Sequence, residues 1–216
     1  MLLNFFSCCS FGIRHDTIVQ VQFVLASNNP HKLTEVQRIL PDIKFLTPSD
    51  FGIKFAYHEN GNTFDQNAVG KARHFFYQLI ITRVDDYAGL CVASLKGANG
   101  LRSARFGPPG QRLNDLGRYK YLLSQLGNST DRSATFVCCI AIILDRHRLV
   151  IIQDAVAGDI TWHPRGTLGF GYDPVVCIPR LGKTMAELTA HEKDKISHRG
   201  RALRRAALFL NETSSY

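Results

Sequence analysis

The sequence lacks several features that mark particular classes of protein. No apolar run approaches the ~20 residues that a transmembrane helix needs, and the six cysteines include no C-x-x-C pair of the kind that holds zinc. The Walker pattern G-x-x-x-x-G-K-[ST] is absent, as are internal repeats and low-complexity segments. We therefore expect a globular protein with free thiols, no membrane partner and a location in the reducing cytoplasm.

Basic side chains outnumber acidic ones in this sequence. There are 26 Lys and Arg side chains against 18 Asp and Glu, which gives a net charge of +8. Such an excess suits nucleic acid, a membrane surface or an anionic small molecule. Several arginines near the C-terminus could equally form a solvated basic face. Because no helix-turn-helix, zinc finger or aromatic RNA-binding signature accompanies them, we expect an anionic small molecule and no nucleic acid.

The length of 216 residues suits one domain. We expect residues 21–212 to form it and residues 1–20 to be a disordered N-terminal extension. Residues 1–13 are apolar, but Arg14 follows this stretch instead of preceding it. A secretory signal has its positive charge first, so the order argues against one.

The first structural unit is predicted to be a strand, a loop and a helix. Residues 21–26 are a short apolar run suited to a buried strand. Asn29 followed by Pro30 is typical of an N-cap and a first helical residue. The apolar stripe of this helix is Leu33, Val36 and Leu40. A loop that ends at a helix N-terminus can hold a phosphate group.

A second helix is predicted to begin at Thr63, whose spacing from Gln66 is that of a capping box. Asn67 and Lys71 share one face, which we expect to lie away from the core. The expected core face consists of Phe64, Ala68, Ala72, Phe75, Phe76 and Leu79. Two later helices are indicated by the apolar sets Leu113, Leu116, Leu123 and Leu126, and Leu203, Ala206, Ala207 and Leu210.

The fold class follows from how these elements alternate. Residues 134–144 and 148–157 are predicted to be neighbouring antiparallel strands around a turn at residues 145–147. Helical segments are interleaved with strands along the rest of the chain. The sequence therefore predicts an α/β fold with a mixed sheet.

Asp85 and Asp86 are the carboxylates best placed for metal chemistry. They follow the apolar residues 80–81 and precede an expected turn at residues 88–89. That position would put both at the edge of a sheet, facing a cleft. Mg²⁺ prefers one or two carboxylates together with water and phosphate oxygens. The alternative interpretation is that adjacent aspartates simply end a strand in solvent.

The segment 166–205 carries the most information. A glycine-rich turn at residues 169–174 contains Phe170 and Tyr172, and Ser197 is predicted to cap a helix that opens with His198. The positive end of a helix attracts anions. Flat aromatic rings beside such an end suit a purine nucleotide with several phosphates, although core packing would also account for the two rings.

Five segments, in the same order, resemble the inosine triphosphate pyrophosphatase family. They are residues 24–32 (VLASNNPHK), 63–71 (TFDQNAVGK), 85–90 (DDYAGL), 97–106 (GANGLRSARF) and 166–205. This family removes deaminated purine nucleoside triphosphates. The resemblance implies an elongated mixed sheet flanked by helices, with two lobes and a central nucleotide cleft. It also implies a homodimer and a Mg²⁺ cofactor.

The resemblance assigns a role to each matching residue. Asp86 would activate water and would bind Mg²⁺ together with Glu59. His198 and Arg199 would contact the base, and Tyr87 would also contact substrate. The phosphate-binding set would be Ser27, Asn28, Asn29, Lys32, Lys71 and Lys193. The base pocket would be shaped by Phe170, Gly171, Tyr172 and Asp173, the last as a hydrogen-bond acceptor.

Several positions depart from the family's pattern. The acidic signature commonly reads Asp-Asp-Ser/Thr-Gly-Leu, whereas DDYAGL has one extra residue and Tyr87 in place of the small hydroxyl side chain. Asn28 stands where glycine is common, Gln66 where glutamate is usual, and Ala93 where aspartate is common. The expected function is hydrolysis of ITP, dITP or XTP to the monophosphate and pyrophosphate. A catalytically impaired nucleotide-binding protein on the same fold is the alternative.

Overall fold

The computed structural model describes residues 22–54, 56–79 and 83–213, so the predicted N-terminal extension lies outside the described residues. The strands are β1 Gln22–Leu25, β2 Lys44–Leu46, β3 Arg83–Val92, β4 Ser133–Ile143, β5 Leu149–Ile160, β6 Val176–Ile178 and β7 Lys183–Thr184. The α-helices are α1 Pro30–Ile39, α2 Phe64–Leu79, α3 Asp115–Leu126, α4 Ala190–Ile196 and α5 His198–Thr213. None of the described helices combines the length and the hydropathy needed to cross a bilayer.

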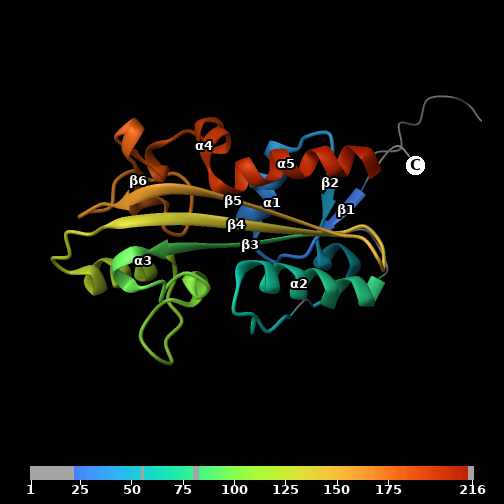
Figure 1. The fold of residues 1–216 in the computed structure, drawn as a ribbon, viewed down its shortest axis with the longest axis horizontal. Helices are drawn as coiled ribbons and strands as arrows, with labels where there is room; N and C mark the ends of the chain where they lie inside the picture. Colours follow the sequence, from blue (N-terminus) through green and yellow to red (C-terminus); the bar gives the residue numbers. More distant parts are fainter. Residues whose placement is uncertain (1–21, 55, 80–82, 214–216) are drawn as a thin grey trace, which may run out of the picture.

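The strands form a single mixed sheet in the order β2-β1-β3-β4-β5-β6-β7. β1 runs parallel to β2 and β3, and the other neighbours are antiparallel. Figure 1 shows β3, β4 and β5 extending through the length of an elongated molecule. α1 and α5 pack on one face of these strands and α2 packs on the other. Leu122 and Leu126 of α3 pack on the same face as α5, against Leu90, Val92 and Phe136. The predicted α/β fold with a mixed sheet and the predicted hairpin at residues 134–157 are confirmed.

The long strand β3 corrects one prediction. It continues through residues 88–89, where a turn was expected, and pairs with β4 residue by residue from Arg83–Ile143 to Val92–Ala134. Successive side chains of a strand point to opposite faces. Asp86 therefore shares a face with the core beneath α1 and α5, whereas Asp85 and Tyr87 face α2.

Two helix starts are built as the sequence predicts. The Asn29 side chain accepts a hydrogen bond from the His31 amide at 3.0 Å, and Pro30 opens α1. Ser197 Oγ accepts a hydrogen bond from the Gly200 amide at 3.1 Å at the start of α5. A Cβ on Gly200 would lie 1.9 Å from the Asp194 carbonyl oxygen, so only glycine allows α4 to meet α5 this closely.

The second helix differs from its prediction in two respects. Thr63 caps α2 by accepting from the Gln66 amide at 3.3 Å, but the Gln66 side chain accepts from Asn62 and leaves the predicted box incomplete. Asn67 and Lys71 were expected to face away from the core, yet both are buried. Asn67 Oδ1 accepts from the Gly61 amide at 2.9 Å and so fixes the loop that leads into α2.

The predicted apolar stripe of α3 is wrong in part. The helix begins at Asp115, so Leu113 precedes it, and Leu116 is 46% exposed. The buried positions are Leu122 and Leu126. An apolar spacing in the sequence does not show which turn of the helix reaches the sheet. The stripe of α5 is confirmed, since Leu203, Ala206 and Leu210 are buried against the sheet.

Candidate active site

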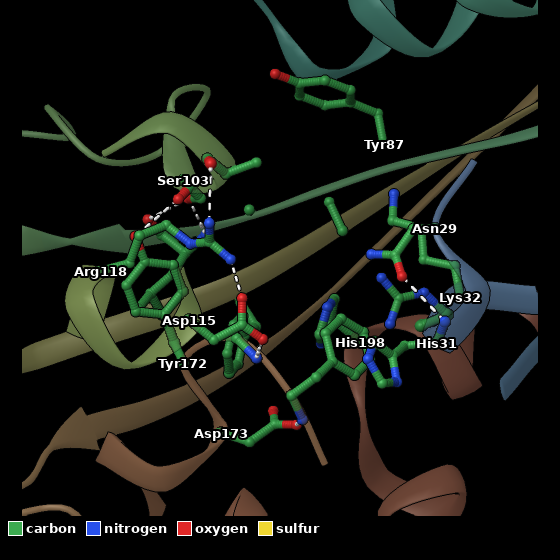
Figure 2. Close-up of a pocket in the computed structure, with 18 of the residues that line it drawn as sticks. Asn29, His31, Lys32, Tyr87, Ser103, Asp115, Arg118, Tyr172, Asp173 and His198 are labelled. Carbon is green, nitrogen blue, oxygen red and sulfur yellow. Dashed lines mark hydrogen bonds and ion pairs between the residues drawn. The ribbon is translucent and has the colours of Figure 1, made fainter. Parts of the chain in front are cut away.

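A cavity of about 290 Å³ lies between the two ends of the molecule. Its walls come from four of the five segments that resemble the pyrophosphatase family, together with the start of α3, Glu59 and Phe136. Figure 2 shows Asn29, His31 and Lys32 on one side and Ser103, Asp115, Arg118 and Tyr172 on the other. The segment 63–71 contributes no described residue to the wall. The size and the mixed polar and aromatic lining suit a small-molecule ligand.

Most of the residues predicted to bind substrate or metal do line this cavity. They are Asn29, Lys32, Glu59, Tyr87, Phe170, Gly171, Tyr172, Asp173, Lys193, His198 and Arg199. Four other predicted residues, Ser27, Asn28, Lys71 and Asp86, are not part of the cavity wall that the described residues form. Ser27 instead supports the loop before α1, because its Oγ accepts from the Asn29 amide at 3.2 Å.

Lys32 connects the first turn of α1 to β3. Its Nζ donates to the Asp86 carbonyl oxygen at 2.7 Å and lies 3.8 Å from the Asp86 carboxylate. Burial lowers the pKa of Lys32, although the Asp86 carboxylate opposes this shift. Since Lys32 lines the cavity beside the N-terminus of α1, it can meet a phosphate group there.

Arg199, at the start of α5, holds two carboxylates that come from different elements. Its Nη1 lies 2.5 Å from Glu35 Oε2 on α1, and its Nε donates to Asp86 Oδ2 on β3. Burial would raise the pKa of Asp86, but Arg199 and then Lys32 hold it well below its ordinary value. Asp86 is therefore an ionised partner of two cations and has no exposed surface.

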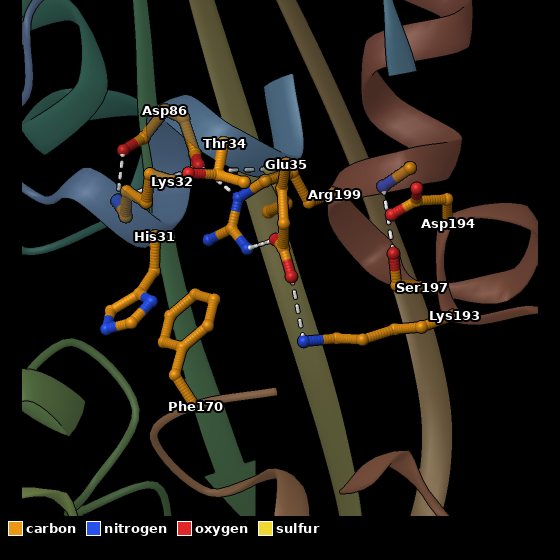
Figure 3. Close-up of polar contacts among 12 residues, drawn as sticks. His31, Lys32, Thr34, Glu35, Asp86, Phe170, Lys193, Asp194, Ser197 and Arg199 are labelled. Atoms are coloured by element: carbon orange, nitrogen blue, oxygen red, sulfur yellow. Dashed lines mark hydrogen bonds and ion pairs between the residues drawn. The ribbon is translucent and has the colours of Figure 1, made fainter. Parts of the chain in front are cut away.

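Lys193 extends this buried network toward the loop of residues 169–173. Its Nζ lies 2.8 Å from Glu35 Oε1 and 2.5 Å from Asp173 Oδ2. Figure 3 shows Lys193, Glu35, Arg199, Asp86 and Lys32 as a continuous series of ion pairs. Asp173 also accepts from the Phe170 amide at 2.7 Å, as the sequence-based prediction of an acceptor role requires.

Glu35 was missed at the sequence level. It is 6% exposed and lies on α1, where a glutamate would ordinarily face solvent. Burial would raise its pKa, but Arg199 and Lys193 together lower it. Its partners are 158 and 164 residues away, so no local pattern in the chain could have revealed them.

Phe170 lies in the cavity between two glycines that have positive φ, Gly169 at 75° and Gly171 at 66°. Its ring stacks on the His31 ring with centroids 5.1 Å apart and planes 15° apart. Lys193 Nζ lies 4.8 Å from the centroid of the Phe170 ring. The aromatic side chain therefore bridges the loop of residues 169–173 and α1 across the cavity.

The end of the cavity near Gly171 and Tyr172 is fixed by contacts to α3 and to the loop before it. The Tyr172 hydroxyl donates to the Ser103 carbonyl oxygen at 2.7 Å, and the Gly171 amide donates to Asp115 Oδ2 at 2.7 Å. Arg118 pairs with the other oxygen of Asp115. No functional motif in the sequence includes Asp115 or Arg118, although an Asn-Asp pair that opens an apolar helix is a recognisable N-terminus signal.

His198 is buried and its ring stacks on Phe136, with centroids 4.6 Å apart and planes 8° apart. Burial, followed by the charge of Arg199, lowers the pKa of His198 to about 3. The ring is therefore neutral at physiological pH, with one nitrogen that donates and one that accepts. Its Nδ1 has no hydrogen-bond partner among the described residues.

The face of β3 toward α2 has a different character. Asp85 is fully buried and its Oδ1 lies 3.3 Å from Lys71 Nζ. Burial raises the pKa of Asp85 to about 6, although Lys71 opposes the shift. Lys71 is thus directed at a carboxylate beneath the cavity. Lys71 is not part of the cavity wall that the described residues form, and its contact with phosphate stays a prediction.

Tyr87 stands on the same face as Asp85 and lines the cavity beside Glu59. Its hydroxyl donates to the Leu101 carbonyl oxygen at 2.5 Å, and its ring packs against Phe64 at 5.7 Å between centroids. Glu59 Oε2 lies 3.0 Å from Arg105 Nη2. Among the described residues that line this part of the wall, Glu59 is the one that carries a carboxylate.

The described residues do not fit the predicted magnesium pair. Glu59 lies on the cavity wall beside Tyr87, whereas the Asp86 carboxylate points to the opposite face of the sheet and is held by Arg199. Within the described ranges, no group of three or more His, Cys, Asp or Glu side chains is arranged to hold a metal ion. The two carboxylates assigned to Mg²⁺ are therefore not brought together.

Comparison with known proteins agrees with this architecture. The dITP/XTP pyrophosphatase of Treponema denticola is 42% identical over 184 residues, which are 85% of this chain and 95% of that protein. The dITP/XTP pyrophosphatase of Nitrosomonas europaea is 40% identical over 200 residues, 90% of this chain and 96% of that protein. A HAM1 protein from Coxiella burnetii has a solved structure with a TM-score of 0.80 and 38% identity, covering 89% of this chain and 99% of that one.

The Ham1 protein of Staphylococcus aureus is similar to the same degree, with a TM-score of 0.79, 37% identity and coverage of 88% of this chain and 98% of that one. The Ham1 family itself matches residues 23–209, which include every segment that carries the resemblance seen in the sequence. The agreement extends over the fold, the order of the segments and nearly the full length of the relatives. The chain therefore belongs to the Ham1 family.

Proposed function

We propose that this protein hydrolyses deaminated purine nucleoside triphosphates, namely ITP, dITP and XTP, to the monophosphate and pyrophosphate. The observation that carries the proposal is the cavity itself, which collects residues from the segments 24–32, 85–90, 97–106 and 166–205. Its relatives in Treponema denticola and Nitrosomonas europaea are named dITP/XTP pyrophosphatase. Clearing such nucleotides from the pool is the corresponding role.

The phosphates are assigned to the end of the cavity formed by the first turn of α1. Lys32 supplies a point charge there, and the N-terminus of α1 supplies backbone amides and a positive partial charge. Asn29 keeps the loop in place through its cap of the His31 amide. Lys193 has its charge balanced by Glu35 and Asp173, so it serves to position Asp173 and the loop of residues 169–173.

The base is assigned to the end formed by Phe170, Tyr172 and His198. Hypoxanthine and xanthine have a carbonyl oxygen at position 6, where adenine has an amino group. A donor at that point favours the deaminated base, because an adenine amino group would face a donor without forming a bond. The neutral His198 ring, which lines the cavity, can supply such a donor.

Dependence on Mg²⁺ is part of the proposal because cleavage of a triphosphate generally uses a divalent ion to bridge its oxygens. The carboxylates predicted to hold that ion do not form a pair, so no step is assigned to the metal. Asp86 was expected to activate water. It is fully buried between Arg199 and Lys32, and we assign it the positioning of these two cations.

Three expectations are carried into the proposal: the homodimer from the resemblance, the cytoplasmic location from the free thiols, and the single domain of residues 21–212 from the length of the chain. Size-exclusion chromatography with light scattering tests the dimer directly. A mass of about twice the 24.2 kDa of the chain supports it, and a monomer at micromolar concentration contradicts it.

The experiment that tests the function is pyrophosphate release by the full-length protein with Mg²⁺, comparing inosine, xanthosine, adenosine and guanosine triphosphates. We expect the first two to be preferred. Equal release from all four would contradict the assignment of the base site. Absence of both release and binding would contradict the proposed substrate class.

The alternative is a nucleotide-binding protein with impaired catalysis. Tyr87 favours it, because a neutral aromatic side chain lies on the cavity wall beside Glu59. The named relatives give it no support. Saturable binding of ITP by calorimetry, without pyrophosphate release above background, is the result that would select it.

A further inference from the structure

The register of β3 decides which residue occupies the second acidic position of the DDYAGL segment. In the pattern Asp-Asp-Ser/Thr-Gly-Leu the second aspartate stands two residues before glycine. Counted back from Gly89, that residue is Tyr87, and Asp86 falls on the first position. Counted forward from Asp85, the second acidic position is Asp86, and the segment then has one residue more than the pattern before Gly89.

The structure favours the count from Gly89. An extra residue within a strand would produce a bulge, in which two residues oppose one on the neighbour. β3 has none in this stretch, since Asp85, Asp86, Tyr87, Ala88 and Gly89 each pair with a single residue of β4. A shift of one residue would instead place every side chain on the other face.

Gly89 itself is held in place by the loop of residues 97–106. A Cβ on Gly89 would lie 2.3 Å from the Gly100 carbonyl oxygen, so no larger residue fits there. Ser103 Oγ accepts from the Leu90 amide at 2.8 Å and locks the next residue. Gly89 and Leu90 are thus fixed in place, and the residue two positions ahead of the glycine is Tyr87, which lines the cavity.

The groups around Tyr87 carry charges of both signs, as in a binding site for a charged ligand. Glu59 lies beside it on the cavity wall, and Lys71 Nζ lies 5.9 Å from the centroid of its ring. Its phenol stays neutral, because burial and then Glu59 raise its pKa. A neutral phenol that donates to the Leu101 carbonyl oxygen lacks the negative charge of an aspartate and has one oxygen where a carboxylate has two.

We propose that Tyr87 occupies the place of the metal-binding carboxylate in this chain, so that the cavity wall there offers a divalent cation a single carboxylate, Glu59. Resting on the proposed function, this inference identifies Tyr87 as the residue that limits both metal affinity and turnover. The single-carboxylate site holds Mg²⁺ only together with the phosphates of a bound nucleotide.

The test compares the wild-type protein with Tyr87→Asp and with Tyr87→Asn, which has the same shape without the charge. Binding of Mn²⁺ alone is measured by electron paramagnetic resonance, and pyrophosphate release from ITP is measured in parallel. We expect Tyr87→Asp to bind Mn²⁺ at least about tenfold more tightly than the other two proteins. Its release of pyrophosphate should rise by about tenfold or more as well.

Binding of ITP without metal, by calorimetry, separates this inference from the proposed function. If wild-type protein fails to bind ITP, the function fails, whatever the Mn²⁺ result. If Tyr87→Asp and Tyr87→Asn bind Mn²⁺ equally, or if wild-type protein already binds it as tightly as Tyr87→Asp, the inference is overturned.

If Tyr87→Asp does not fold, two variants that retain Tyr87 provide a second measurement. Glu59→Gln should weaken the Mn²⁺ binding that the ITP complex shows to that of free ITP, whereas Asp86→Asn should keep it as long as its circular dichroism spectrum is native. Loss of Mn²⁺ from a natively folded Asp86→Asn complex would overturn the inference, because it would place Asp86 among the metal ligands.

Discussion

Lys193 and Glu35 form a buried ion pair, with 2.8 Å between Nζ and Oε1, although 158 residues separate them in the chain. The pair joins the short helix α4 to α1, and Arg199 at the start of α5 shares the other oxygen of Glu35. One carboxylate therefore fixes three helices around the same cavity. Its partners are cations that the resemblance assigns to substrate, so charge balance within the protein and binding of substrate depend on the same residues.

Removal of the Glu35 carboxylate should be strongly destabilising. Glu35→Ala leaves Lys193 with Asp173 alone and Arg199 with Asp86 alone, both still buried. Breaking a buried ion pair from one side costs about 3 to 5 kcal/mol. We expect a decrease of that size in the free energy of unfolding, measured by urea denaturation. The control is Asp42→Asn, an exposed carboxylate, and an equal effect in the two variants would contradict the prediction.

His198 should make the protein sensitive to acid. Its pKa is about 3 in the folded protein because of burial and the charge of Arg199, against an ordinary value of 6.5. The unfolded chain therefore binds more protons between these values, and stability falls as the pH drops from 6.5 toward 3. The loss at pH 4 should be about 3 kcal/mol from this residue alone.

The measurement is urea unfolding at pH 7 and at pH 4 for wild-type protein and for His198→Phe. The phenyl ring keeps the stack on Phe136 but cannot be protonated, so the variant should lose less stability at pH 4. His147→Asn, at an exposed turn, should behave as wild type. An unchanged pH dependence in His198→Phe would show that the carboxylates account for the acid sensitivity.

Local patterns in the sequence were sufficient for the elements that are fixed locally. The Asn29 cap, the Ser197 cap and the hairpin at residues 134–157 each depend on neighbours in the chain, and all are as predicted. The resemblance supplied the cavity, since most residues it assigned line one wall or another. The local patterns and the resemblance can both be recognised in the sequence without knowledge of tertiary packing.

The remaining features of the site could be predicted only with knowledge of how the strands pair and pack in the sheet. Whether Asp86 or Tyr87 faces the cavity depends on how β3 pairs with β4, and a shift of one residue reverses the answer. Lys71 was placed on a free helix face because nothing in α2 indicates that Asp85 lies beneath it. Glu35 was overlooked because its burial is caused by two cations from the far end of the chain.

Asp115 should contribute to nucleotide affinity without touching the nucleotide. Its Oδ2 accepts from the Gly171 amide at 2.7 Å and thereby holds the loop beside the base end of the cavity. Asp115→Ala removes a charge-assisted hydrogen bond, which is worth about 1.5 to 3 kcal/mol, so the Kd for ITP should rise about tenfold or more. Calorimetry measures this change, with Asp131→Ala as an exposed control.

Separate measurement of KM and kcat for Asp115→Ala distinguishes a positioning role of Asp115 from a general loss of structure. If Asp115 acts only by holding the loop, KM should rise while kcat stays within about threefold of wild type. An equal decrease in kcat and kcat/KM would instead assign Asp115 to the transition state. A lower midpoint of thermal unfolding in Asp115→Ala alone, with unchanged KM, would contradict the positioning role.

The two glycines that flank Phe170 should respond differently to alanine. Both have positive φ, 75° at Gly169 and 66° at Gly171, so each substitution costs about 1 to 2 kcal/mol in backbone strain. Around Gly171 nothing lies within 4 Å of an added Cβ, whereas at Gly169 the Cβ would lie 2.1 Å from Asp173 Oδ2. Gly169→Ala must therefore displace the carboxylate that pairs with Lys193.

We expect the cost of Gly171→Ala in urea unfolding to be limited to that strain, and Gly169→Ala to lose clearly more because the Lys193–Asp173 pair, with atoms 2.5 Å apart, is broken. The double variant Gly169→Ala with Asp173→Ala identifies the cause. If the added methyl acts through Asp173, the effects of the two substitutions should be far from additive, since the second removes the atom with which the first collides. Simple additivity would show that Gly169→Ala acts through the backbone alone and that its contact with Asp173 has no energetic consequence.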